Sequence, residues 1–266
     1  MKSLINDKLV DSTEAALSIY SLGLNRGYAV FDYFRIVDGQ FRFFDDHLAR
    51  FSNSIRWSGI PCAYNIDEIR QKIIALKNKN GVENGFVRIT LVGGTSMDFA
   101  SIPAESDLII AVGESKSGGI KQEKSGVQLI SKHYQRSIPH IKTTDYFFVQ
   151  MHRKEMLAAN AVDILYYSEF ITETSRANVF FVKNDTLYTP KSNILEGITR
   201  KNVLSLYPDA VLSDISMDQL SDFDEAFICS STKEITPVLK IDDLVIGNGQ
   251  VGSKTREVMK GFAGLL

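Results

Sequence analysis

The feature that most constrains the fold is a run of aromatic and β-branched residues that ends at an Asp-Gly pair. Residues 30–37 have the composition of a buried strand, and Asp38-Gly39 is a favoured two-residue hairpin turn. Residues 41–44 then return as a second strand. Strands joined by so short a turn must be antiparallel, which favours an α+β fold over a regular alternation of strands and helices.

The rest of the chain carries the same kind of signals. A shorter hairpin turns at Asn6-Asp7, between strands near residues 4–5 and 9–10. Helices are expected over 45–58, 66–78 and 146–159 and from near 199, 217 and 254; strands are expected over 85–92, 107–112, 127–131, 164–167, 177–182, 186–188 and 227–230. Asp45 or Asp46 is expected to cap the first helix, and the apolar start of the 146–159 helix is expected to be buried. Residues 114–119 are small, polar and Gly-rich, so they predict a linker between two α+β domains, 1–115 and 121–266.

Composition excludes several classes of partner and site. The chain has 266 residues, with 30 Lys+Arg against 32 Asp+Glu, so no basic excess indicates nucleic acid or a membrane surface. Cys62 and Cys229 are the only cysteines, too few for a disulfide framework or a Cys-rich metal site. The N-terminus lacks the apolar core of a signal peptide, and no apolar run reaches about 18 residues. We therefore expect a cytoplasmic protein without a membrane span.

Two motifs match known sites only by their letters, and the histidines match none. Residues 247–252 match the dinucleotide-binding glycine pattern, but too little chain follows for the required helix, strand and acidic residue. Residues 230–233 match the Ser-x-x-Lys motif of penicillin-binding hydrolases without its two companion motifs. The four histidines show no metal-ligand spacing, so no metal site is predicted.

Five short segments place polar residues beside apolar runs. They contain Arg50, Lys142, Glu173, Thr199 and Ser231. Each has an ordinary structural explanation when taken alone. Lys142 fits a solvated loop, Glu173 a strand edge, Arg50 an exposed helix face and Thr199 a helix cap.

Together these segments resemble the class IV, or fold-type IV, pyridoxal-phosphate enzymes. That family includes branched-chain and D-amino-acid aminotransferases and aminodeoxychorismate lyase. The resemblance runs from about residue 23 to residue 256 and is densest at Lys142 and at 173–180, 197–200 and 234–238. It implies a two-domain α+β fold like that of D-amino-acid aminotransferase, pyridoxal 5'-phosphate (PLP) as cofactor, and a homodimer. The aromatic segment 28–34 also has more apolar surface than one hairpin face can bury, which favours a dimer.

The resemblance implies two catalytic residues. Lys142 resembles the lysine that binds PLP covalently and carries the proton, a role that suits an amine that is neutral part of the time. Glu173 resembles the carboxylate that pairs with the pyridine nitrogen and keeps it protonated. Tyr146 is similar in position to the tyrosine near the ring hydroxyl.

The resemblance also implies a phosphate site. Arg50 resembles the phosphate-binding arginine, whose forked donors suit that anion. Ile198 and Thr199 resemble the helix N-terminus that receives the phosphate on backbone N–H groups. Ser231 resembles a further phosphate ligand.

Departures from the family pattern bear on the substrate. Phe31 stands where D-amino-acid aminotransferases have a tyrosine, and residues 97–100, which include Asp98, lack the Arg and His with which those enzymes hold the substrate carboxylate. Arg88 resembles an arginine of the branched-chain and lyase branches. Phe31, Arg88 and Asp98 are therefore the candidate substrate residues, and small amino and oxo acids the expected partners. A branched-chain-like donor is favoured over a D-amino acid. The alternatives are 4-amino-4-deoxychorismate lyase and a binding protein without catalysis.

Overall fold

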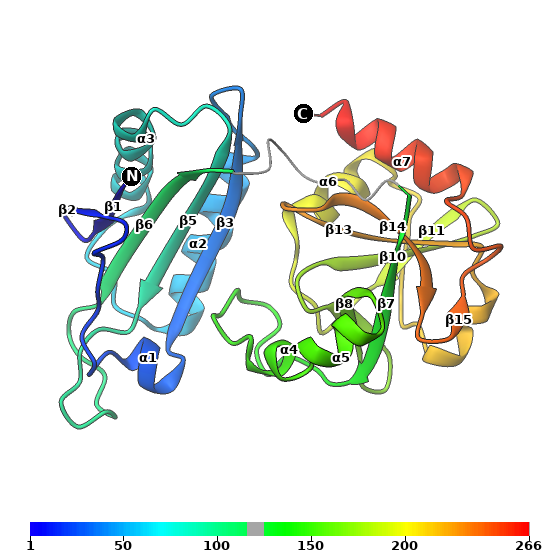
Figure 1. Ribbon diagram of the computed structural model, residues 1–266, viewed down its shortest axis with the longest axis horizontal. Coiled ribbons are helices and arrows are strands. Elements are labelled where there is room, and N and C mark those ends of the chain that lie inside the picture. Colours follow the sequence, from blue (N-terminus) through cyan, green and yellow to red (C-terminus); the bar gives the residue numbers. More distant parts are fainter. Residues whose placement is uncertain (116–124, 266) are drawn as a thin grey trace. The chain divides into compact units, whose positions relative to one another are not determined.

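The computed structural model describes residues 1–115 and 125–265, which group into two compact units (Figure 1). One unit contains Met1–Gly119 together with Ile141–Asp145, and the other contains Ile120–His140 and Tyr146–Leu266. The short segment around Lys142 therefore packs with the first unit although its neighbours in sequence pack with the second. The domain limits 1–115 and 121–266 stay a prediction. In the expected linker, Glu114 ends a strand, and residues 116–119 lie outside the described residues.

The first unit is one antiparallel sheet with two long helices. Its strands are β1 (Lys2–Ile5), β2 (Lys8–Asp11), β3 (Ala29–Val37), β4 (Gln40–Phe41), β5 (Gly85–Val92) and β6 (Asp107–Glu114), and its helices are α1 (Leu22–Arg26), α2 (Phe44–Ser58) and α3 (Ile66–Asn80). The strand order is β2-β1-β6-β5-β3-β4. Apolar side chains of α2 and α3, such as Phe51 and Ile73, pack against Phe34 and Ile89 of the sheet in one buried core.

Alternation along β3 assigns its side chains to two faces. Phe34 and Ile36 are fully buried in the core that α2 covers, and Asp32 shares their face because side chains alternate along a strand. Phe31 lies on the opposite face. Strand β3 therefore presents different chemistry on its two sides, and both sides carry candidate residues.

The second unit is built on a larger, mostly antiparallel sheet. Its strands are β7 (Val127–His133), β8 (Ala161–Tyr167), β9 (Ile171–Thr174), β10 (Asn178–Lys183), β11 (Thr186–Pro190), β12 (Val211–Ser213), β13 (Glu225–Ser230), β14 (Glu234–Ile241) and β15 (Leu244–Val245). Its helices are α4 (Phe147–Met151), α5 (Arg153–Ala158), α6 (Ile198–Leu206), the 3-10 helix η1 (Met217–Asp222) and α7 (Ser253–Ala263).

The sheet of the second unit curls. Its order is β12-β11-β10-β13-β14-β7-β8-β9, with β15 beside β14, yet β9 also contacts β10 and β11. Strand β7 runs parallel to both of its neighbours, and the other pairs except β11–β12 are antiparallel. Helices α6 and α7 pack on the β13–β14 part of the sheet, where Figure 1 shows α7 in red.

Both predicted hairpins and the 85–92 strand are confirmed, but the return strand of the second hairpin covers Gln40–Phe41 and not 41–44, because Phe44 already begins α2. Several other details also differ. Helix α2 has no side-chain cap: Phe43 precedes it in a left-handed conformation, and Asp45 and Asp46 lie in the first turn. The expected 146–159 helix is interrupted at His152. Its start is not buried as a whole, because Val149 is buried while Phe147 is 74% exposed.

Within residues 1–115 and 125–265, no helix combines the length and apolar character that crossing a bilayer requires.

Candidate active site

The backbone around Lys142 lies along the edge of β3. The N–H of Phe31 donates to the carbonyl of Lys142 at 2.9 Å, and Thr144 N–H donates to the carbonyl of Ala29 at 3.2 Å. Ile141 is buried in the core of the first unit. These contacts fix the position of the lysine backbone relative to β3.

The side chains of Lys142 and Arg88 meet at one aromatic ring. The Lys142 Nζ atom lies 4.7 Å from the centre of the Phe31 ring, and the Arg88 guanidinium carbon lies 4.0 Å from it. Phe31 itself is 4% exposed. Each cation is attracted to the negative face of the ring, so Phe31 gathers two candidate residues around itself. The structure thus brings together Lys142, Phe31 and Arg88.

The other face of β3 carries a buried ionic network. Asp32 is fully buried and accepts two hydrogen bonds of 2.8 Å from Nε and Nη2 of Arg50. His47 Nδ1 lies 2.7 Å from the same carboxylate and acts as a donor to it. Arg50, which the sequence predicts as a phosphate ligand, is therefore held by a bidentate pair and not on a solvent-exposed helix face.

Burial and charge set the ionisation of this network. Burial alone would raise the pKa of Asp32, but the Arg50 cation and the hydrogen bonds from His47 and Arg50 hold that pKa well below its usual value. The pKa of His47 is lowered chiefly by burial, with the charges of Arg50 and Lys142 acting in the same direction. The network is thus an aspartate anion, an arginine cation and a neutral histidine.

Asp98 is engaged by its own loop. Its carboxylate accepts hydrogen bonds from the Ser96 and Ser101 hydroxyls and from the N–H groups of Ala100 and Ser101. The pKa of Asp98 is lowered, with the Ser101 hydroxyl as the largest cause. This geometry makes Asp98 an organiser of the 96–101 loop.

In the second unit, Glu173 lies in β9 and is 4% exposed. Its Oε2 accepts from the N–H of Leu195 at 3.0 Å, and its Oε1 accepts from Arg136 Nη1 at 3.3 Å. Arg136 also donates to the carbonyl of Pro139 at 3.0 Å. Arg136 was missed from the sequence, because nothing local links it to a residue 37 positions away.

The N-terminus of α6 is an anion-binding geometry. Gly197 precedes the helix, and the first intrahelical N–H bond is that of Lys201 to the Gly197 carbonyl, so the N–H groups of Ile198 and Thr199 have no intrahelical acceptor. A side chain at Gly197 would collide with Asn178, whose Oδ1 lies 2.1 Å from the position of the missing Cβ. The partial positive charge of a helix N-terminus favours a phosphate.

The remaining two predicted residues also lie in the second unit. Ser231 sits in the turn between β13 and β14, and Tyr146 immediately precedes α4, where it packs against a cluster that includes Val149 and Tyr166. The candidates of the second unit are thus Glu173, Tyr146, the α6 N-terminus and the Ser231 turn.

These donor sets fit PLP. Within the second unit, a buried carboxylate suits the pyridine nitrogen and a helix N-terminus suits the phosphate; within the first unit, the Lys142 amine suits the aldehyde.

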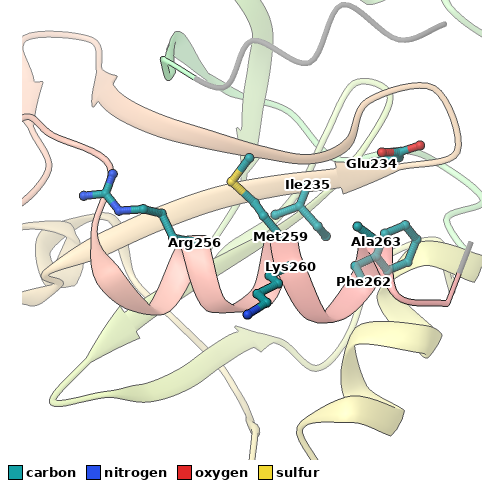
Figure 2. Close-up of a pocket in the computed structure, with 7 residues that line it drawn as sticks. All are labelled: Glu234, Ile235, Arg256, Met259, Lys260, Phe262 and Ala263. Atoms are coloured by element: carbon teal, nitrogen blue, oxygen red, sulfur yellow. The ribbon is translucent and has the colours of Figure 1, made fainter.

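Two other features of the second unit lie apart from these residues. A cavity of about 270 Å³ between β14 and α7 is lined by other side chains, among them Arg256, Met259 and Lys260 of α7 (Figure 2). The glycine-rich segment 247–252 leads into α7, whose N–H groups of Lys254 and Thr255 donate to the carboxylate of Glu225. Because a protein carboxylate already caps this helix, the dinucleotide pattern is a turn, as its missing context predicts.

Comparison with known proteins identifies relatives that match along almost the whole chain. The family model described as amino-transferase class IV matches residues 29–241. D-alanine aminotransferase of Staphylococcus haemolyticus is 27% identical, over 98% of this chain and 96% of the relative. D-alanine aminotransferase of Bacillus licheniformis is 29% identical, over 97% of this chain and 94% of the relative.

Solved structures agree with the family match. The branched-chain aminotransferase of Escherichia coli superposes with a TM-score of 0.90 at 23% identity, covering 99% of this chain and 94% of the other, and therefore establishes the fold. A branched-chain aminotransferase of Thermoproteus uzoniensis has a TM-score of 0.88 at 26% identity, covering 99% and 93%. A Legionella pneumophila protein provisionally named 4-amino-4-deoxychorismate lyase has a TM-score of 0.85 at 24% identity, covering 96% and 97%. The chain has the two-domain α+β fold of these enzymes and belongs to the PLP-dependent class IV aminotransferase family.

Proposed function

We propose that the chain is a transaminase for a small amino acid with a branched-chain-like side chain, and that Lys142 is its catalytic lysine. The observation that carries the proposal is the packing of Lys142 and Arg88 on the single ring of Phe31, at 4.7 and 4.0 Å. In this proposal the Lys142 amine, in its neutral form, serves the chemistry at the amino group, and the Arg88 guanidinium binds the substrate carboxylate.

When bound, PLP supplies an electron sink for the charge that develops at Cα of an amino acid. Lys142 would take up the Cα proton on Nζ and later give it up, so that Nζ acts first as base and then as acid. Glu173 holds a proton at the pyridine nitrogen through its buried carboxylate. The N–H groups of Ile198 and Thr199, with Arg50 and Ser231, bind the phosphate. Tyr146 would lie near the ring hydroxyl of the bound cofactor.

The proposed substrate preference rests on Phe31, Arg88 and Asp98, the candidate substrate residues. Phe31 replaces a polar tyrosine by an apolar ring, which suits an aliphatic side chain. Arg88 supplies a carboxylate-binding cation from β5. Asp98, bonded to its own loop, shapes the 96–101 loop and leaves recognition of the carboxylate to Arg88.

Two other activities are carried by specific observations. D-alanine transamination is favoured by the curated relatives, which are named for it. The lyase reaction on 4-amino-4-deoxychorismate is favoured by the Legionella structure. A binding protein without catalysis would have no use for both Lys142 and Glu173. We further propose a cytoplasmic homodimer. Both cysteines are free, as is usual in the cytosol. The homodimer rests on the family resemblance alone, because the apolar side chains of segment 28–34, such as Val30, Phe31 and Phe34, are already buried within one chain, contrary to the expectation from the sequence.

Covalent labelling tests the assignment of Lys142. Borohydride treatment of the purified protein with PLP should remove the absorbance band of the bound cofactor, and peptide mapping should find the pyridoxyl group on Lys142. Lys233, which is paired with Asp163, serves as the internal control and should stay unlabelled. A label on any other lysine contradicts the proposal.

Substrate scans then separate the three activities. The protein is mixed with L-leucine, D-alanine and 4-amino-4-deoxychorismate in turn, and the cofactor absorbance and product are followed. We expect conversion of the cofactor band and an oxo acid with L-leucine. Pyruvate released from aminodeoxychorismate would identify the lyase, and conversion by D-alanine alone would identify the D-amino-acid enzyme.

The role of Glu173 has its own test. Glu173→Gln keeps an acceptor for Leu195 N–H but removes the negative charge that holds the ring proton. Turnover should fall at least about 100-fold while the borohydride label on Lys142 persists. Near-normal turnover would remove Glu173 from the mechanism.

A further inference from the structure

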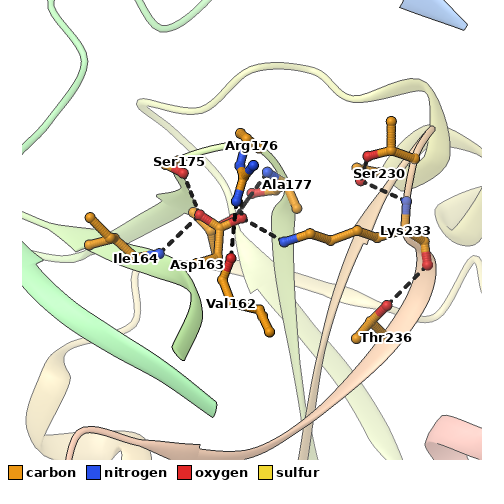
Figure 3. A network of polar contacts seen from close by, with 11 residues as sticks. Val162, Asp163, Ile164, Ser175, Arg176, Ala177, Ser230, Lys233 and Thr236 are labelled. Carbon is orange, nitrogen blue, oxygen red and sulfur yellow. Dashed lines mark hydrogen bonds and ion pairs between the residues drawn. The ribbon is translucent and has the colours of Figure 1, made fainter. Parts of the chain in front are cut away.

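A buried aspartate connects three segments of the second unit. Asp163 lies in β8 and is fully buried. It accepts hydrogen bonds from Lys233 Nζ at 2.8 Å, from the Ser175 hydroxyl and from its neighbour Ile164 N–H at 2.9 Å. Arg176 lies farther away, with its Nε 3.8 Å from Oδ2. Figure 3 shows the Lys233 side chain extended from the β13–β14 turn to this carboxylate.

Asp163 and Lys233 form an ion pair and are 70 residues apart in sequence. Burial alone would raise the pKa of Asp163, but the charges of Lys233 and Arg176 and the hydrogen bonds from Lys233 and Ser175 lower it, so the carboxylate is ionised. A buried anion needs such a partner, because an uncompensated one is strongly unfavourable. Lys233 therefore cannot leave the carboxylate without cost.

The turn that Lys233 anchors is strained. Glu234, the residue after Lys233, has a φ of 48°, a left-handed conformation that a glutamate rarely adopts. Side-chain contacts hold the turn around it: Lys233 N–H donates to the Ser230 hydroxyl at 3.2 Å, and Thr236 donates to the Lys233 carbonyl at 3.0 Å. A strained turn of this kind persists only where its surroundings fix it, and the Asp163–Lys233 pair attaches it to a strand 70 residues away in sequence.

The same turn carries Ser231, which the proposed function assigns to the phosphate. We propose that Lys233, anchored on Asp163, is a positioning residue for phosphate binding: it fixes the turn so that Ser231 faces the anion, without contacting the phosphate itself. The inference rests on the proposed function and deepens it, because it predicts a preference for the phosphorylated cofactor that depends on two residues outside the phosphate ligands.

The test compares two ligands that differ only in the phosphate. Absorbance titration gives the affinities of the full-length protein for PLP and for pyridoxal, and their ratio isolates the contribution of the phosphate. We expect Lys233→Met to lower this ratio about five- to tenfold, the effect of losing one well-placed hydrogen bond, while the affinity for pyridoxal is unchanged. Asp163→Asn alone should lower the ratio about threefold or more, because the amide is a weaker anchor.

The Asp163→Asn variant separates positioning from direct contact. If Lys233 touched the phosphate itself, releasing it from Asp163 would leave the ratio unchanged or raise it, and that result overturns the proposal. The double variant Lys233→Met/Asp163→Asn removes the uncompensated buried charge and keeps an acceptor for Ser175. Its stability to urea should approach that of the wild type, whereas its ratio should stay low. A double variant with the wild-type ratio would show that Lys233 acts on stability alone.

A surface pair gives the matched control. Lys183 pairs with Asp222 at 3.1 Å, and both side chains are about half exposed, so Lys183→Met should leave the ratio unchanged. The proposal would be overturned if Lys183→Met lowered the ratio of PLP to pyridoxal affinity as much as Lys233→Met does. The wild-type ratio is measured first. A wild-type protein without preference for PLP over pyridoxal refutes the proposed phosphate site, whereas a wild-type preference that survives both single variants refutes only this inference.

Discussion

Each unit of the molecule contains a fully buried aspartate on a strand, and the two aspartates are held in different ways. Asp32 is paired with Arg50 by two hydrogen bonds and with His47 by a third, all from helix α2. Asp163 is paired with Lys233, which reaches it from a turn 70 residues away. One network is local and includes a titratable histidine. The other is long-range and includes a hydroxyl, the Ser175 side chain, in its place.

The difference separates two uses of a buried charge. In the first unit the cation is itself a candidate ligand, so Asp32 orients a group that is proposed to touch the phosphate. In the second unit the cation is an anchor, and the ligand is a neighbouring residue of the turn. A bidentate arginine fixes orientation, whereas a lysine supplies a point charge at the end of a flexible stem. We therefore expect the first network to tolerate substitution less well.

The largest expected effect comes from breaking the first pair. Arg50→Met leaves the buried Asp32 anion without a cation, with only hydrogen bonds from the neutral His47 and the Tyr33 N–H, and should cost about 3 kcal/mol or more of unfolding free energy. Lys233→Met should cost about 2 kcal/mol, because Asp163 keeps Ser175 and a nearby Arg176. Urea denaturation of both variants measures the two losses. Equal losses, or a larger loss for Lys233→Met, would contradict the distinction between the networks.

An intermediate effect is expected on the pH dependence of folding stability between about pH 5 and 8, which should come from the first network alone. The folded pKa of His47 lies below its ordinary value of 6.5, chiefly because of burial. Its contribution to stability is therefore fully present above pH 6.5 and is lost as the pH falls toward the lower folded pKa, at up to about 1.4 kcal/mol per pH unit. The second network contains only Asp163 with a lowered pKa, so its contribution is lost only below about pH 4.

The single tryptophan makes this measurable. Trp57 lies on α2 of the first unit, so its fluorescence in urea titrations from pH 8 to pH 5 follows the unfolding of that unit. His47→Asn, whose amide can still donate to Asp32, should flatten the slope. The exposed His133 gives the control, and His133→Asn should keep the wild-type slope. An unchanged slope in His47→Asn would show that burial of His47 does not govern the pH dependence.

The smallest expected effect comes from the hydroxyl of the second network. Ser175→Ala removes one donor from Asp163 while the ion pair with Lys233 remains. The cost should be about 1 kcal/mol, measured by urea titration followed by far-ultraviolet circular dichroism, which reports on both units. A cost above that of Lys233→Met would mean that the hydroxyl, and not the lysine, is the main partner of Asp163.

Local signals made much of the fold predictable. Tight turns with favourable residues fixed the hairpins, and both Asn184 and Asp185 adopt the left-handed conformation that the turn after β10 needs. Strand β14 was missed because Pro237 argues against a central strand, yet Pro237 pairs with Phe227 within the sheet. Strand β9 was missed because Thr172, Glu173 and Thr174 are polar, although all are buried.

The candidate site also contains contacts that the sequence could predict and contacts that it could not. The Asp32 network was accessible from sequence in principle: alternation along β3 puts Asp32 on the core face, and a buried charge requires a partner such as His47 or Arg50 on the next helix. Arg136 beside Glu173 and Lys233 beside Asp163 could not be found in that way, because their contacts depend on how the second sheet curls. The catalytic, cofactor and substrate roles themselves stay predictions.

The placement of Ile141–Asp145 restricts how such an enzyme can be divided or recombined. The segment is joined covalently on both sides to residues of the second unit, while its hydrogen bonds to Ala29 and Phe31 belong to the first. In a hybrid made by exchanging everything after the expected linker, residues 141–145 would come from the other relative, while the β3 strand that they contact would come from this chain. Substrate preference should therefore be exchanged between relatives only when β3 and residues 141–145 are replaced together. Separate fragments of the two units should attach the cofactor only after they are recombined.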